Sequence, residues 1–233
     1  MVFVKVTYYG HSCFSVQIAG KNLLFDPFIT PNPHAAKVDA GSLSPDYILL
    51  SHGHFDHVAD VGLIGSKSGA SLIGNYEVLR WFGAKGLEKA HPMNSGGSYC
   101  FEFGRVTFTP AIHSSSMPDG TYGGQPGGFL VETNDGSFYY SGDTALTRDM
   151  ELVVRSLKSS QLTFAALCIG DNFTMGVSDA VIAAEWLQCS QILGVHFDTF
   201  PQIEIDHESA REAFAREGKT LHLLNPGQER AMV

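Results

Sequence analysis

Four side chains that can bind metal ions lie within six consecutive residues: His52, His54, Asp56 and His57. They directly follow the apolar run Tyr47–Leu50, which predicts a buried strand. In an extended segment alternate residues face the same side, so His52, His54 and Asp56 can point together, while His57 requires a turn. Imidazole and carboxylate groups at this density are typical of transition-metal binding and are too many for one small structural site. The spacing therefore predicts two neighbouring ions.

The pattern His52-x-His54-x-Asp56-His57 resembles the signature of the metallo-β-lactamase superfamily. Within it, the chain is most similar to small bacterial and archaeal metal-dependent hydrolases and to their relative ascorbate-6-phosphate lactonase. The superfamily resemblance spans essentially the whole chain, from Gly10 to Glu229. The finer resemblance depends on the joint order of four motifs: Tyr9-Gly10-His11-Ser12-Cys13-Phe14, Asp26-Pro27-Phe28, Ile169-Gly170-Asp171-Asn172-Phe173-Thr174-Met175-Gly176 and His196-Phe197-Asp198-Thr199-Phe200-Pro201.

The resemblance implies three more ligands, each after a later strand: His113 after 105–111, Asp143 after 137–141 and His196 after 191–195. We assign His52, His54 and His113 to the first ion. We assign Asp56, His57 and His196 to the second ion, with Asp143 between the two ions. All seven directly follow predicted strands. Strand ends that share one edge of a sandwich converge, and the loops there are free to carry function.

Two divalent ions about 3.5–4 Å apart lower the pKa of a bridging water and hold the attacked group. The expected reaction is attack by a metal-bridging hydroxide on a small ester, lactone or phosphoester. Asp56 is also a candidate for proton handling as the leaving group departs. Zinc is the first choice of metal, and manganese the second because the lactonase relative uses it. Position 143 holds aspartate and not the cysteine of the classical lactamases, which argues against β-lactam hydrolysis. Diiron oxidoreductases of the superfamily have a glutamate where this chain has His54–Phe55, which argues against redox chemistry.

Other polar residues of the motifs have weaker assignments. His11 resembles a family position near the metals and is predicted to contact substrate or donate a proton, with a structural role as the alternative. Asp26 is expected to hold a ligand histidine from behind, and Asp171 and Thr199 could do similar work. The glycine-rich stretch 114–128 is expected to border the pocket. The remaining histidines are expected to be structural or on the surface: His34, His91, His207 and His222.

Composition narrows the choice of partners. The 233 residues are 44% hydrophobic and carry a net charge of −9, without a block of lysine or arginine. A phosphate-backbone footprint needs a basic surface, so a small-molecule substrate is expected and nucleic acid is not. No run of 18 apolar residues and no signal-like start are present, so we expect a cytoplasmic protein without a membrane span. Four cysteines without a CxxC pair suit a reducing compartment. A homo-oligomer is compatible with the sequence.

Strand and helix signals predict one α/β domain over residues 1–233. Strands are expected first (2–9, 13–18, 22–26, 46–50, a short one at 72–73, 98–103, 105–111, 128–133 and 137–141), with helices beginning at the caps Asp60 and Asn75. Helices at 148–158, 178–188 and 206–217 then alternate with strands at 164–169, 191–195 and 220–224. The family resemblance implies an αββα sandwich, in which two mixed β-sheets pack face to face with helices outside.

The leading hypothesis is a dinuclear metal-dependent hydrolase. Three rivals remain: a nuclease or phosphodiesterase of the ribonuclease Z kind, a mononuclear iron dioxygenase of the same fold, and a non-enzymatic metal-binding protein. The acidic balance argues against the first and the extra ligands Asp56 and His57 against the second.

Overall fold

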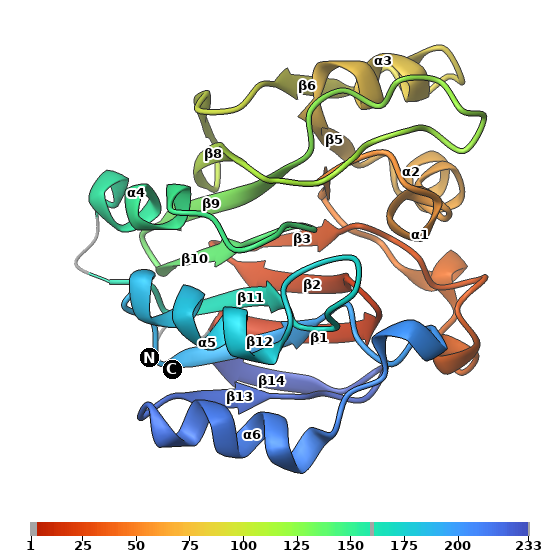
Figure 1. The fold of residues 1–233 in the computed structure, drawn as a ribbon. Coiled ribbons are helices and arrows are strands. Elements are labelled where there is room, and N and C mark those ends of the chain that lie inside the picture. Colours follow the sequence, from red (N-terminus) through yellow and green to blue (C-terminus); the bar gives the residue numbers. More distant parts are fainter. Residues whose placement is uncertain (1–3, 159–160, 233) are drawn as a thin grey trace.

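Two seven-stranded sheets form the centre of the molecule (Figure 1). The computed structural model describes residues 4–158 and 161–232. The first sheet has the order β14-β1-β2-β3-β4-β5-β6 and the second the order β13-β12-β11-β10-β9-β8-β7. The strand bounds are β1 Val4–Gly10, β2 Cys13–Ile18, β3 Lys21–Phe25, β4 Tyr47–Leu50, β5 Ser71–Asn75, β6 Ala90–Met93, β7 Ser98–Phe101, β8 Gly104–Pro110, β9 Gly127–Thr133, β10 Gly136–Tyr140, β11 Phe164–Cys168, β12 Gln191–Val195, β13 Thr220–His222 and β14 Glu229–Met232.

Helices cover the outer faces of both sheets. Helices α1 to α3 accompany the first sheet, and α4 to α6 pack on the second, with α5 against β11 and α6 against β13 (Figure 1). This arrangement is the predicted αββα sandwich. The helix bounds are α1 Phe55–Val58, α2 Val61–Ser68, α3 Tyr76–Gly83, α4 Asp149–Ser156, α5 Val177–Trp186 and α6 His207–Arg216, with short 3-10 turns η1 Pro33–Ala35, η2 Ala40–Ser42 and η3 Pro201–Ile203.

Both sheets are mixed. In the first sheet β3 to β6 run parallel, and in the second β10 to β13 run parallel, while the remaining neighbours are antiparallel. Parallel strands place their carboxyl ends at one edge of a sheet, where the connecting loops meet. The loops after β4, β10 and β12 therefore have a common edge on which to build a site.

Aromatic side chains fill the space between the two sheets. Phe14 and Phe25 of the first sheet stack at 4.6 Å, and both meet Tyr140 of the second sheet edge to face at 5.1 and 5.6 Å. All three are fully buried. Burial of one such side chain contributes roughly 1.5–3 kcal/mol to folding, and each aromatic pair adds about 0.5–1.5 kcal/mol. This rigid layer fixes the strand ends relative to one another.

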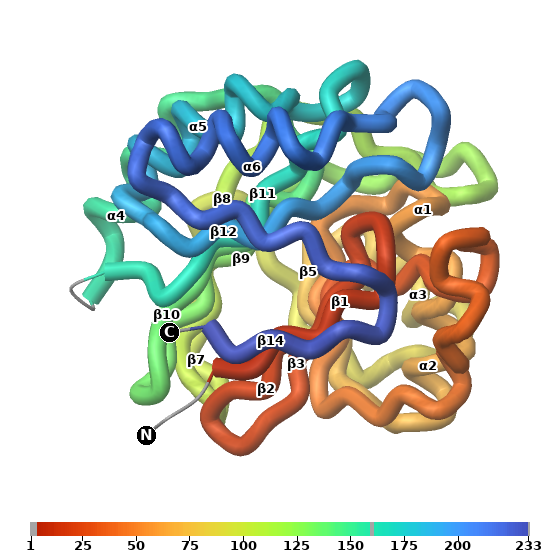
Figure 2. The backbone as a smooth tube through the Cα atoms, turned by 90° about the horizontal axis from the view of Figure 1, so that it is seen from below, coloured from red at the N-terminus to blue at the C-terminus, as the bar shows by residue number. Residues whose placement is uncertain are grey.

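Most of the predicted elements are confirmed within a few residues, and three were not anticipated. The short helix α1 and the strands β6 and β14 carry no clear sequence signal, and β14 pairs with β1 from the opposite end of the chain, as Figures 1 and 2 show. Asn75 caps α3 as predicted by accepting from the Val78 N–H. Asp60 lies at the N-cap position of α2 as predicted, but its carboxylate makes no capping hydrogen bond and accepts instead from the backbone of Ile29 and Thr30.

None of the helices within the described ranges combines the length and the apolar character needed to cross a bilayer.

Candidate metal centre

The histidine loop changes conformation in its middle. Strand β4 ends at Leu50, an irregular segment follows, and α1 begins at Phe55 with His54 at its N-cap position. The expected alternation therefore stops at His54, and Asp56 and His57 project from the first turn of a helix instead of a strand. The turn that His57 requires is thus supplied by α1. The ring atoms His52 Nε2 and His54 Nδ1 come within 2.9 Å of each other.

Three groups of side chains have potential ligand atoms within 4.8 Å of one another; two contain the predicted ligands, and the third joins Asp26 to His52 and His57. The first group contains only histidines: His52, His54 and His113. The second group contains one carboxylate, Asp56, and three imidazoles, those of His11, His57 and His196. The structure thus brings together the predicted residues in the predicted division, even though they come from the ends of different strands. The second group also contains His11, which the sequence analysis expected near the metals but not among the ligands. No cysteine belongs to a comparable group among the described residues.

Asp143 reaches both groups through one oxygen. Its Oδ2 lies 2.9 Å from His196 Nε2 and 3.1 Å from His57 Nε2 in the second group. The same atom is 3.7 Å from His113 Nε2 and 4.0 Å from His52 Nε2 in the first. A carboxylate at this point can bridge two ions, as the sequence predicts, but it lies nearer the second group.

His57 Nε2 and Asp143 Oδ1, two buried polar atoms at the centre, make no assigned hydrogen bond in the described part of the chain, although His57 Nε2 lies 3.1 Å from Asp143 Oδ2; His196 Nδ1 makes none either. Leaving such atoms unsatisfied in a buried site costs about 1–3 kcal/mol each. The first two atoms are good ligands for a divalent cation, and a neutral imidazole with ionised carboxylates is the donor set that such an ion prefers. The residues present therefore fit a metal centre.

Burial keeps the first histidine group neutral. It lowers the pKa of His52 well below its ordinary value, and the neighbouring His57 adds to the shift. Burial likewise lowers the pKa of His54 and of His113. Because an imidazole binds a metal only without its extra proton, these three side chains are ready for an ion near neutral pH.

The second group is held together by opposite charges. Burial alone would lower the pKa of His57, but the carboxylates of Asp143 and Asp56 outweigh it and raise this pKa well above the ordinary value. Burial alone would raise the pKa of Asp143, but His196 and His57 outweigh it and lower that pKa strongly. An ion that enters here replaces the proton of His57, so binding releases a proton and strengthens as the pH rises.

Asp26 supports His57 from behind, as the sequence suggested. Its buried Oδ2 accepts from His57 Nδ1 at 2.8 Å and from the Tyr140 hydroxyl at 2.6 Å. The backbone N–H and the hydroxyl of Ser51 donate to the same carboxylate. These bonds fix the His57 ring with Nε2 directed at the centre. Neither Ser51 nor Tyr140 was recognisable from the sequence, because a serine after a strand and a tyrosine within one are ordinary.

His11 links the second group to a later loop. Its Nε2 lies 3.0 Å from Asp56 Oδ2 and its Nδ1 lies 2.9 Å from Thr199 Oγ1. Burial, with the nearby His196, lowers the pKa of His11 to about 4. The neutral ring carries one proton, and the Asp56 carboxylate, which can only accept, places that proton on Nε2 and leaves Nδ1 to accept from the Thr199 hydroxyl. The contact between Thr199 Oγ1 and His11 Nδ1 therefore agrees with the supporting role suggested for Thr199.

The glycine-rich stretch 114–128 contacts the histidine loop. Ser114 Oγ lies 3.3 Å from His54 Nε2, and the Gly53 N–H donates to Ser115 Oγ at 3.1 Å. Gly142, next to Asp143, adopts a left-handed conformation, and a Cβ there would lie 2.3 Å from the Gly127 carbonyl oxygen. The close approach at Gly142 thus needs a glycine and sets the position of Asp143.

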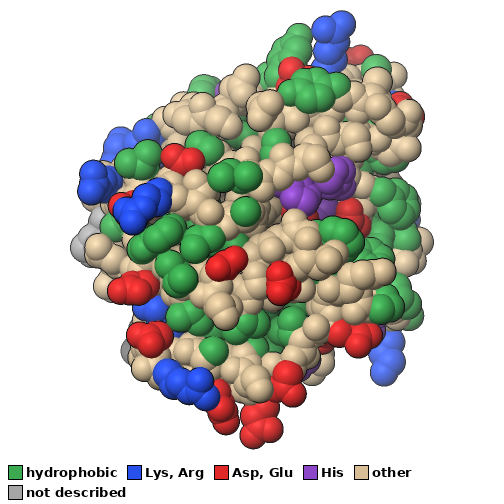
Figure 3. Space-filling model, viewed as in Figure 1, with side chains coloured by type: hydrophobic (Ala, Val, Ile, Leu, Met, Phe, Trp, Pro, Cys, Tyr) green, Lys and Arg blue, Asp and Glu red, His purple; other side chains and the backbone are tan. Residues whose placement is uncertain are grey.

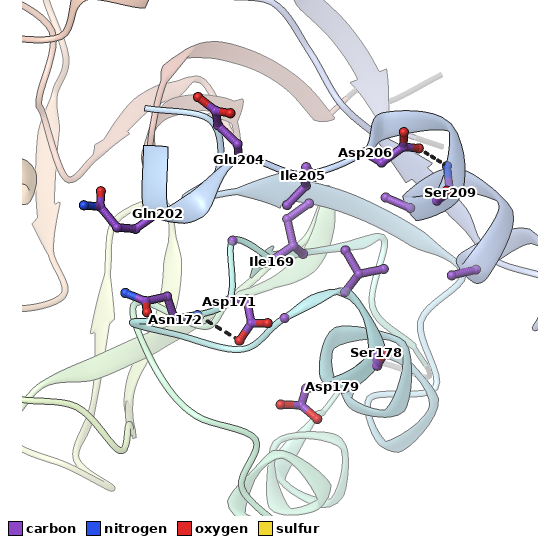
Figure 4. A pocket seen from close by; sticks show the side chains of 15 residues that line it. Ile169, Asp171, Asn172, Ser178, Asp179, Gln202, Glu204, Ile205, Asp206 and Ser209 are labelled. Carbon is purple, nitrogen blue, oxygen red and sulfur yellow. Dashed lines mark hydrogen bonds between the residues drawn. The ribbon is translucent and has the colours of Figure 1, made fainter. Parts of the chain in front are cut away.

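Asp171 does not take part in the centre, contrary to the suggestion from sequence. It is exposed, accepts a hydrogen bond from the backbone of Asn172 and lines a separate hollow of about 770 Å³ with Asp179, Glu204 and Asp206 (Figure 4). The histidines without a motif also lie outside the two groups: His34, His91, His207 and His222.

Comparison with known proteins agrees with this geometry. The family model described as "Beta-lactamase superfamily domain" matches residues 21–197. A UPF0173 metal-dependent hydrolase of Flavobacterium johnsoniae is 49% identical over 97% of this chain and 98% of its own length. Among solved structures, the metallo hydrolase Igni18 of Ignicoccus hospitalis has a TM-score of 0.88, with 27% identity over 99% of both chains. YhfI of Bacillus subtilis, described as a metallo-beta-lactamase fold protein, shares the fold at a TM-score of 0.74 and 16% identity, over 99% of this chain and 100% of its own.

Proposed function

The chain belongs to the family of UPF0173 metal-dependent hydrolases within the metallo-β-lactamase superfamily, and on this premise we propose that it hydrolyses a small ester, lactone or phosphoester at a dinuclear centre. The observation that carries the proposal is the pair of adjacent ligand groups with Asp143 Oδ2 within 4.0 Å of both. A single ion would leave one group without a cation. The motif similarity to ascorbate-6-phosphate lactonase adds weight to a lactone.

Each ligand set has a defined part in the proposal. His52, His54 and His113 hold one ion. Asp56, His57 and His196 hold the other, with Asp143 between them. Bound ions of this kind lower the pKa of a coordinated water and polarise the group that it attacks. Hydrolysis then adds water across the acyl or phosphoryl bond, giving an acid and an alcohol.

His11 and Asp56 are the candidates for moving a proton. Neutral His11 can donate its Nε2–H to Asp56 Oδ2 when the Thr199 hydroxyl donates to Nδ1. Asp56 is partly exposed, with 24% of its side chain accessible, so it can reach a substrate as well. In this role Asp56 takes up the proton that the attacking water loses and passes it to the departing alkoxide, while His11 holds the carboxylate in place.

Zinc is the metal we propose first, and manganese second. Three imidazoles in the first group suit zinc, while the carboxylates around the second suit a harder ion. The acidic composition, with 15 basic against 24 acidic residues, supports a small molecule over a nucleic acid as substrate.

Elemental analysis and a substrate screen test the proposal together. Protein purified without chelator and then loaded with zinc or manganese should bind two ions per chain and hydrolyse some member of a panel of esters, lactones and phosphodiesters. Saturation at one ion per chain would contradict the dinuclear centre. Two bound ions without turnover on any of the three classes would contradict the proposed reaction.

A further inference from the structure

The metal centre opens to solvent through only a few of its ligands. His52, His57, Asp143 and His196 are almost completely buried, while Asp56 and His113 keep 24% and 13% of their side chains exposed. His54 is also partly exposed. A substrate must therefore approach past the residues that flank these three ligands.

Large apolar side chains stand at both flanks of the opening. Phe55 separates His54 from Asp56 and is 53% exposed, and Ile112 precedes His113 and is 58% exposed. Neither side chain belongs to the buried core, since more than half of each is exposed, although Phe55 also meets Phe28 edge to face. An exposed apolar side chain beside a buried polar site often marks a binding surface.

Two more such side chains come from neighbouring loops. Phe173, 51% exposed, lies on a loop that bonds to Thr144, because the Met175 N–H donates to the Thr144 carbonyl oxygen at 2.9 Å. Ile112 donates its N–H to the Thr144 hydroxyl at 2.9 Å, so both loops meet beside Asp143. Tyr122, 62% exposed, pairs across a β-bridge with Ser116, two residues from Ser114, which contacts His54.

No positive side chain stands among these segments. Lysine and arginine are absent from all the stretches that build the centre and its surroundings: 8–15, 26–36, 51–60, 111–128, 141–147, 169–178 and 195–206. In Figure 3 the histidines reach the surface next to hydrophobic side chains, and lysines and arginines lie elsewhere on that face. A second anionic group on the substrate would therefore find no lysine or arginine in the segments that carry the opening; Arg211 lies on α6, where it lines a hollow with His11 and Thr199.

We propose that Phe55, Ile112, Tyr122 and Phe173, here called the apolar rim, bind the non-reacting part of the substrate. The substrate class is then an ester or lactone with an aliphatic or aromatic body and no charge away from the reacting group. Phosphorylated sugars and nucleotides do not fit this class, so the similarity to ascorbate-6-phosphate lactonase is taken to extend to the lactone ring and not to the phosphate. The inference rests on the proposed hydrolase function and adds specificity to it.

The rim predicts a dependence on chain length. A fully buried methylene improves binding by about fourfold, so four methylenes that the half-open rim buries only in part should improve it by roughly tenfold or more. An aliphatic chain that ends in a carboxylate should lose this gain, because its charge would have to be desolvated against apolar side chains.

Binding of hydroxamic acids to the metal-loaded protein tests the rim without requiring turnover. Calorimetry should show that hexanohydroxamic acid binds at least tenfold more tightly than acetohydroxamic acid, and that the monohydroxamate of adipic acid shows no such gain. Phe173→Ala and Tyr122→Ala should each reduce the hexano-to-aceto ratio about threefold or more. Leu152→Ala, which removes an equally exposed side chain on α4, should leave the ratio unchanged.

Hydrolysis of a matched set of esters then separates the apolar-rim proposal from the hydrolase proposal. Acid release from methyl hexanoate or hexyl acetate should exceed that from methyl acetate in kcat/KM, and monomethyl adipate should resemble methyl acetate. Ester hydrolysis without any chain-length preference, or tighter binding of the charged tail, would overturn the rim and leave the hydrolase proposal standing. Chain-length-dependent hydroxamate binding without hydrolysis of any ester, lactone or phosphodiester would retain the rim as a ligand site and reject the hydrolase proposal.

Discussion

Replacing Asp26 with asparagine should weaken the second metal site without removing the fold. The carboxylate only accepts hydrogen bonds, and it accepts from the Ser51 backbone at one end and from Tyr140 and His57 at the other. An asparagine amide has one accepting and one donating end. Whichever way it turns, an N–H group faces another N–H group, either that of Ser51 or that of His57.

The expected loss follows from the His57 ring. With the amide oxygen bonded to the Ser51 N–H, the amide nitrogen faces His57 Nδ1, and the neutral ring relaxes by moving its proton to Nε2. That proton then points at the centre, where the ion should bind. Loss of such a supporting partner typically costs 10–100-fold in metal affinity, or about 1.4–2.8 kcal/mol. Exchanging the charge-assisted bonds from Tyr140 and His57 for neutral ones should lower the free energy of unfolding by about 2 kcal/mol.

Asp60→Asn supplies the matched control. Asp60 is also a buried carboxylate, and it accepts from the backbone of Ile29 and Thr30 a few residues after Asp26, but it contacts no histidine. Chelator competition should show a weakened second ion in Asp26→Asn and normal affinity in Asp60→Asn, while both variants lose stability in urea titrations. Equal metal affinity in the two variants would refute the orienting role of Asp26.

Three further predictions follow from the same geometry. Asp143→Ala should abolish turnover on any substrate found and leave circular dichroism unchanged, whereas full activity with two ions bound would exclude the bridging role. His11→Asn, which tolerates the left-handed backbone there (φ 54°), should lower kcat while both ions remain bound, and loss of one ion would instead identify His11 as a ligand. Metal-free protein should lose stability as the pH falls from about 6.5 toward 4: burial lowers the pKa of His222 to about 4, so the unfolded chain takes up its proton first. Thermal melts of His222→Gln should show a smaller loss over this range, and an unchanged pH profile would contradict the assignment.

Local signals predicted most of the elements. The helix expected over 206–217 forms over His207–Arg216, where the Asp206 carboxylate accepts from the Ser209 N–H and Gly218 is left-handed. Strand β14 has no such signal, since its sequence Glu229–Met232 is largely polar and exposed. Its strand character comes from pairing with β1, which lies at the other end of the chain. Contacts of this kind are invisible to periodicity.

The candidate site divides in the same way. The histidine loop was recognisable because its four polar residues are adjacent in sequence, and motif order supplied His113, Asp143 and His196. The hydrogen bond from Tyr140 to Asp26 joins residues 114 positions apart on different sheets, so no local pattern could indicate it. The helical turn at Phe55 was missed because its four residues are too few for a helical period.

Backbone conformation adds a reason why the strand ends, and not the strands, carry the centre. His11, Asp26 and His196 each follow a strand and each adopt a positive φ, of 54°, 40° and 56°. A left-handed conformation costs such residues about 1–2 kcal/mol, and sequence pattern alone does not reveal it. The reversal turns each side chain out of the strand's alternation and toward the shared edge, where the two ligand groups form. Substitution by glycine would relieve the strain but remove the functional group, so at these three positions the strain accompanies the chemistry.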